Sequence, residues 1–183
     1  MTEKIDRSIS VSRAYILMMR FLVPLLLVLV VIAWAIRGTG FMIDVVLVLQ
    51  EPWRLLLLMI LGVFFHEWIH GLTWAILGGK PIKDLKFGFQ WKSLTPYAYM
   101  REPIPLRAYR WGAIMPAILL GFIPYVTGLL IGSPFWTLYG WLFILAAGAD
   151  FVILWLLRNE GGDVLVQDHP SRVGCFVIQD DFV

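Results

Sequence analysis

Long runs of apolar residues dominate the chain and are separated by short polar segments. Four of these runs reach the roughly 20 helical residues that cross the hydrocarbon core of a bilayer. They lie at about 15–36, 53–77, 111–131 and 135–157. The pattern predicts an all-α polytopic membrane protein with four transmembrane helices, folded as a single domain over residues 1–183.

A different period marks the segment 80–105, between the second and third runs. Apolar and polar residues alternate over 85–92, and a period of two is typical of a strand. The sequence at 93–96, Ser-Leu-Thr-Pro, is typical of a turn, and 97–100 favours a return strand. We therefore expect a small β-hairpin between the second and third helices.

The composition agrees with a membrane environment. Apolar residues make up 60% of the chain and charged residues 15%, whereas soluble domains have about 45–50% and 25%. A net charge of +2 is too small to indicate a nucleic-acid partner. The single cysteine, Cys175, excludes an internal disulfide framework and a multi-cysteine metal site. The lipid bilayer is therefore the expected surrounding.

Lysine and arginine are distributed unevenly between the connecting segments. They are frequent in the N-terminal segment up to the start of the first run (Lys4, Arg7, Arg13, Arg20) and within 80–110 (Lys80, Lys83, Lys86, Lys92, Arg101, Arg107, Arg110). The positive-inside rule then places both termini, the 80–105 segment and the tail 158–183 in the cytoplasm. We expect an integral protein of the cell membrane of a prokaryote. The first run is too long for a cleaved signal peptide and is expected to be an uncleaved anchor.

The second run contains His66-Glu67-Trp68-Ile69-His70. Residues four apart lie on one face of a helix, so the two imidazoles can bind one metal ion. In this pattern the glutamate takes a proton from a metal-bound water and returns it to the leaving amine. Zinc suits such ligands. We therefore predict His66 and His70 as zinc ligands and Glu67 as the catalytic base.

A catalytic zinc usually has a third protein ligand, and Asp150 is the candidate. It is the only charged residue in the fourth run, where a buried carboxylate requires a partner. The second and fourth helices should run in the same direction. His66 and His70 lie 13 and 17 residues beyond Trp53, and Asp150 lies 15 residues beyond Phe135. At about 1.5 Å per residue, Asp150 falls between the histidines in depth.

Each of these residues also has a structural interpretation. The histidine motif could form a polar cluster or an ion pathway, and Asp150 could be a helix-packing aspartate. In the tail, Asp168 and His169 precede Pro170, and we expect a local turn in which Asp168 caps the backbone. A regulatory or site-covering role for this pair is the alternative. Glu160 is expected in a solvated linker.

The motifs also resemble a known family. The histidine motif, Gly88-Phe89, Glu102-Pro103-Ile104 and Asp168-His169-Pro170 are similar to those of a family of small membrane proteins classed as zincin peptidases. The similarity covers roughly 55–175. The arrangement also resembles the core of the site-2 protease family of intramembrane zinc metalloproteases. The resemblance implies His66, His70 and Asp150 as zinc ligands and Glu67 as base.

The function expected from these features is a zinc-dependent endopeptidase that acts in or near the membrane on membrane proteins or peptides. An edge of the 85–100 hairpin could pair with an unwound substrate strand. The alternative is a zinc-binding membrane protein without peptidase activity, either a scaffold or a metal-handling protein. Few ionisable residues in the first and third helices argue against transport, and the presence of Glu67 argues against an inactive scaffold.

Overall fold

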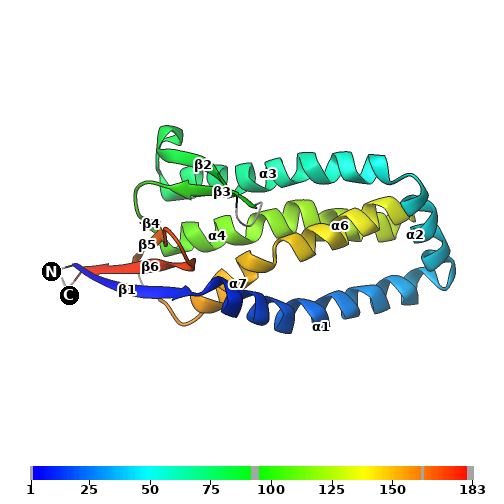
Figure 1. Ribbon diagram of the computed structural model, residues 1–183, viewed down its shortest axis with the longest axis horizontal. Helices are drawn as coiled ribbons and strands as arrows, with labels where there is room; N and C mark the ends of the chain where they lie inside the picture. Colours follow the sequence, from blue (N-terminus) through cyan, green and yellow to red (C-terminus); the bar gives the residue numbers. More distant parts are fainter. Residues whose placement is uncertain (1, 92–94, 162, 181–183) are drawn as a thin grey trace.

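The computed structural model of the protein describes residues 2–91, 95–161 and 163–180. Within these ranges the chain is mostly helical, and two small antiparallel sheets lie at one end of an elongated helical bundle (Figure 1). Both chain ends lie at this same end of the molecule. The sequence-based expectation of a helical membrane protein is therefore confirmed in outline, whereas the all-α description omitted a sheet.

Three helical segments are long and apolar enough to cross a membrane. They are α1 (Val11–Arg37), α3 (Pro52–Gly78) and the continuous run of α4 (Leu106–Pro116), η2 (Ala117–Phe122) and α5 (Ile123–Ile131). The fourth predicted helix is a pair, α6 (Pro134–Ala146) and α7 (Gly148–Leu156), which bends by 43° at the break and meets the same criterion only when both halves are taken together.

A further helix, α2 (Gly40–Gln50), connects α1 to α3 at the end of the bundle opposite the sheets (Figure 1). This helix was not predicted from the sequence. Its 11 residues are too few to cross a bilayer, so a search for runs of about 20 apolar residues overlooks it.

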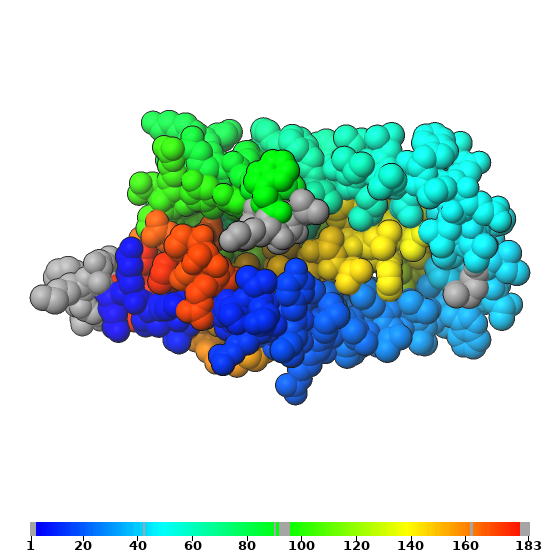
Figure 2. Space-filling view, viewed as in Figure 1, coloured from blue at the N-terminus to red at the C-terminus, as the bar shows by residue number. Residues whose placement is uncertain are grey.

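The larger sheet joins the two ends of the chain. Its strands are β1 (Thr2–Ile9), β4 (Ile104–Pro105), β5 (Leu165–Asp168) and β6 (Val173–Asp180), in the order β1-β6-β5-β4. In the space-filling view the C-terminal segment with β5 and β6, in orange and red, lies between the green hairpin segment and the blue N-terminal segment (Figure 2). Strand β1 was not predicted from the sequence.

The smaller sheet is the predicted hairpin, formed by β2 (Leu85–Gln90) and β3 (Thr95–Met100) after a short turn, η1 (Ile82–Asp84). Thr95 and Pro96, which were expected in the turn, belong to β3, and the remaining turn residues 93–94 lie outside the described residues. The hairpin folds back along α3. A Cβ on Gly71 would meet the Leu85 side chain, and the Phe87 ring stacks 5.3 Å from that of Trp68. The hairpin therefore lies beside the turns of α3 that carry the histidine motif.

A core cluster joins these parts at the sheet end. The end of α3, the hairpin, strand β4, the start of α4, the residue after α7 and strands β5 and β6 contribute buried side chains to it (Trp74, Leu85, Met100, Ile104, Tyr109, Leu157, Val166, Val177). Because elements from both halves of the chain meet there, this core determines how α3, α4 and the tail sheet lie relative to one another.

Candidate metal centre

The structure brings His66, His70 and Asp150 together. Nε2 of His66 lies 3.2 Å from Oδ2 of Asp150, and Nε2 of His70 lies 3.3 Å from Oδ1 of the same carboxylate. Their side chains are 11%, 7% and 13% exposed, respectively. The three residues form a cluster that could hold a metal ion, with one ligand atom of each within 4.8 Å of the others.

The donor set and its spacing fit zinc. Two imidazoles and one carboxylate are ordinary zinc ligands, and three protein ligands leave one position open. Ligand atoms about 2.0–2.1 Å from a tetrahedral zinc are separated from one another by about 3.3–3.4 Å. The two His–Asp separations, 3.2 and 3.3 Å, are measured to different oxygens of the Asp150 carboxylate and are close to this value.

The two histidines are held differently. Nδ1 of His70 donates a hydrogen bond to the carbonyl oxygen of Gly112 on α4, at 2.8 Å. This bond places the proton on Nδ1 and leaves the Nε2 lone pair facing Asp150. Nδ1 of His66 is buried and has no hydrogen-bond partner among the described residues. The orientation of His70 is therefore determined by α4, whereas that of His66 depends on α3 and Asp150.

Glu67 lies on the adjoining face of α3, half-buried beneath the hairpin. Its carboxylate lies close to the backbone amide of Ala98 in β3. Ala98 pairs with Phe87 of β2 on its other side. The other edge of β3, which pairs with no strand among the described residues, therefore faces the glutamate of the motif.

The tail residue Asp168 does not form the expected local turn. The hydroxyl of Tyr109 on α4 donates to Oδ1 of Asp168 at 2.6 Å. The turn is formed instead by His169, whose Nδ1 accepts hydrogen bonds from the backbone amides of Ser171 and Arg172. Burial raises the pKa of Asp168 to about 6. Asp168 thus contacts the helix whose Gly112 orients His70.

Glu160, expected in a solvated linker, forms an ion pair. Nε of Arg7 in β1 lies 2.6 Å from Oε1 of Glu160, whose side chain is only 8% exposed. The backbone oxygen of Glu160 also accepts from Arg110 of α4, at 2.8 Å. The segment after α7 is therefore tied to the N-terminal strand and to α4.

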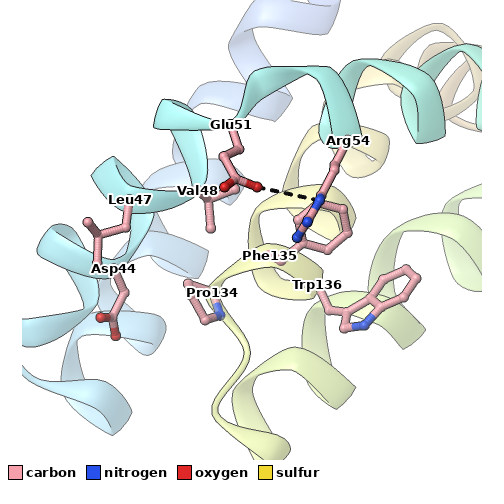
Figure 3. Close-up of a pocket in the computed structure, with 8 residues that line it drawn as sticks. All are labelled: Asp44, Leu47, Val48, Glu51, Arg54, Pro134, Phe135 and Trp136. Atoms are coloured by element: carbon pink, nitrogen blue, oxygen red, sulfur yellow. Dashed lines mark ion pairs between the residues drawn. The ribbon is translucent and has the colours of Figure 1, made fainter.

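A separate cavity of about 520 Å³ lies at the opposite end of the bundle (Figure 3). Residues of α2 line it together with the first residues of α3 and α6. Glu51 and Arg54 also line it and form an exposed ion pair, in which Nε of Arg54 lies 3.4 Å from Oε2 of Glu51. Its lining residues include none of the predicted site residues. The histidine motif therefore lies outside this cavity.

Comparisons with known proteins agree with this site. A family profile described as "Putative zincin peptidase" matches residues 59–165. A curated relative, an uncharacterized 24.7 kDa protein of Pyrococcus woesei, is 27% identical over 119 residues, which is 64% of this chain and 52% of that protein. The chain thus spans about half the length of this relative. No solved structure matches the chain.

Proposed function

Because the chain belongs to the family described as "Putative zincin peptidase", we propose that it is a zinc-dependent endopeptidase that cleaves membrane proteins or peptides within or next to the bilayer. The observation that carries the proposal is the meeting of His66, His70 and Asp150 around one point, with Glu67 adjacent on α3. The proposed zinc ligands are these three residues, and Glu67 is the proposed base.

In this proposal, zinc supplies Lewis acidity toward water and toward the scissile carbonyl. The carboxylate of Glu67 takes a proton from the attacking water as its oxygen forms a bond to the carbonyl carbon. Glu67 then delivers this proton to the amide nitrogen as the C–N bond breaks. His70 keeps its proton on Nδ1, where it is bound to Gly112, and so does not compete for this role.

We propose that the chain crosses the membrane four times, with both termini in the cytoplasm. Strand β1 precedes α1 and pairs with β6, which follows α7. Two paired strands lie on the same side of a bilayer, so the number of crossings between them is even. Three long helices plus the bent α6–α7 pair satisfy this requirement. The cluster of lysine and arginine between 80 and 110 favours the cytoplasm for this side, in the cell membrane of a prokaryote.

We further propose that the free edge of β3 binds the substrate as an added strand. A helical substrate must be extended before its peptide bonds reach a base, and an unpaired edge offers backbone partners for an extended segment. The position of Ala98 supports this, because its outward-facing amide lies next to Glu67. A substrate strand on this edge would therefore pass the proposed base.

The test uses the purified full chain in detergent with zinc, and in lipid vesicles. Fluorescently labelled casein offers an extended substrate, and a labelled single-span helical peptide in the vesicles offers a membrane substrate. Glu67→Gln should bind zinc as the unsubstituted protein does but lose cleavage by about 100-fold or more, because the loss of general-base catalysis costs 10²–10⁴-fold.

The matched control is Glu51→Gln, which removes an exposed carboxylate at the opposite end of the bundle and should leave cleavage unchanged. Equal cleavage by Glu67→Gln and the unsubstituted protein would contradict the role of Glu67. Zinc binding without cleavage of either substrate would instead favour a zinc-binding membrane protein without peptidase activity.

A further inference from the structure

The ring of His70 is the first member of a stack of three aromatic side chains. The Trp74 ring, one helical turn further along α3, stacks on His70 at 5.3 Å with an interplanar angle of 19°. The Tyr109 ring of α4 stacks on Trp74 at 5.4 Å and 5°. All three side chains are buried. We name His70, Trp74 and Tyr109 the aromatic stack; it leads from the candidate metal centre towards the tail sheet.

Hydrogen bonds hold the stack to α4. Nε1 of Trp74 donates to the carbonyl oxygen of Tyr109 at 3.2 Å, and Nδ1 of His70 donates to that of Gly112. Tyr109 and Gly112 are three residues apart and so lie on the same face of α4. Any shift of α4 at Tyr109 therefore also moves the oxygen that orients His70.

The far end of the stack is held by the tail. The hydroxyl of Tyr109 donates to Asp168 at the end of β5, at 2.6 Å. The same carboxylate lies close to the backbone amide of Met100 in β3. Asp168 therefore joins three elements: the tail sheet, the hairpin beside Glu67, and the helix that orients His70.

We propose that Asp168 is a positioning residue for the zinc ligand His70, acting through the Tyr109 hydroxyl, the aromatic stack and the Gly112 carbonyl. The inference rests on the proposed function, because it requires that His70 bind zinc. It assigns a role in the metal site to the tail strand β5, which reaches no ligand directly. Partners that orient a ligating histidine typically contribute a factor of about 10–100 to metal affinity.

The experiment measures zinc affinity of the full chain in detergent by competition with a chelator, and the visible absorption of the cobalt-loaded protein. Tyr109→Phe removes only the hydroxyl and keeps the stacked ring. Asp168→Ala removes the acceptor, whereas Asp168→Asn keeps an acceptor oxygen for the hydroxyl. The matched control is Tyr125→Phe, since Tyr125 is also buried and donates its hydroxyl to a backbone oxygen, that of Leu29 on α1.

We expect Tyr109→Phe and Asp168→Ala to weaken zinc binding by about 10-fold and to alter the cobalt spectrum, because the ring of His70 is less well oriented. Asp168→Asn should bind zinc within about threefold of the unsubstituted protein, since it restores the acceptor. Tyr125→Phe should lower the melting temperature of the apoprotein without changing zinc affinity.

Unchanged zinc affinity and cobalt spectrum in Tyr109→Phe and Asp168→Ala would overturn the inference while leaving the proposed function intact. An equal loss of affinity in Tyr125→Phe would also overturn it, because general destabilisation would then explain the effect. If Tyr109→Phe does not fold, the zinc affinities of Asp168→Ala and Asp168→Asn are compared, and equal affinities would overturn the inference. Failure of the unsubstituted protein to bind zinc would remove the proposed function and this inference together.

Discussion

Nε2 of His66 and Oδ2 of Asp150 lie 3.2 Å apart, although 84 positions separate the two residues along the chain. The contact joins the middle of α3 to the first turn of α7, just after the bend of the α6–α7 pair. The same carboxylate contacts Nε2 of His70. A metal ion held here would therefore connect two helices that are distant in the sequence.

Replacement of Asp150 should remove an anionic ligand from this site. We expect Asp150→Asn to weaken zinc binding by more than about 100-fold, because even partners outside the ligand set contribute 10–100-fold. The measurement is the zinc content of the purified protein together with chelator competition. Asp163→Asn, at an exposed position after α7, is the control and should retain full zinc. Full zinc occupancy in Asp150→Asn would refute its role as a ligand.

The close packing of α4 on α3 depends on a glycine. A Cβ at position 112 would lie 1.9 Å from Nε1 of Trp74, so Gly112→Ala must push the indole or the helix away. We expect a loss of about 1–3 kcal/mol in the free energy of unfolding, as for other overpacked cores. Thermal unfolding in detergent measures it. Gly161→Ala, where a Cβ meets nothing within 4 Å, should leave the melting temperature nearly unchanged.

The raised pKa of Asp168, about 6 in the folded protein against 3.8 normally, makes stability depend on pH. Between these values the folded state binds more protons than the unfolded state, so stability should fall as pH rises from 4 to 6. The full effect is at most about 3 kcal/mol. The measurement is the melting temperature of the unsubstituted protein relative to Asp168→Asn, which lacks this proton. A difference that stays constant between pH 4 and 7 would contradict the prediction.

The ion pair between Arg7 and Glu160 should hold β1 to the segment after α7. Arg7→Ala leaves a carboxylate that is only 8% exposed without its partner, and we expect a loss of about 1–2 kcal/mol. Hydrogen exchange in β1 should accelerate. Arg54→Ala breaks a pair whose side chains are both more than 60% exposed and should cost less than about 0.5 kcal/mol. Equal losses in the free energy of unfolding for the two substitutions would show that the burial of Glu160 does not strengthen its ion pair.

Local patterns predicted most of the helices and the hairpin. Apolar runs of about 20 residues and a period of two are properties of consecutive residues, so 53–77 and 85–100 could be assigned without a partner. Strand β1 has no such local signal, because Glu3, Lys4, Asp6 and Arg7 interrupt its apolar residues. It becomes a strand by pairing with β6 at the other end of the chain. Such pairing between distant segments cannot be read from the residues of either one.

The motif that carries the proposed chemistry can be identified from the order of the residues alone. A helix places residues four apart on one face, so His66 and His70 had to point the same way, and depth along parallel helices indicated Asp150. The contacts that hold these residues in place come from the packing of the folded chain. The contacts of Gly112 with His70 and of Tyr109 with Asp168 join residues 42 and 59 positions apart. They depend on how the helices and the tail sheet pack, and no periodic pattern within one segment encodes that packing.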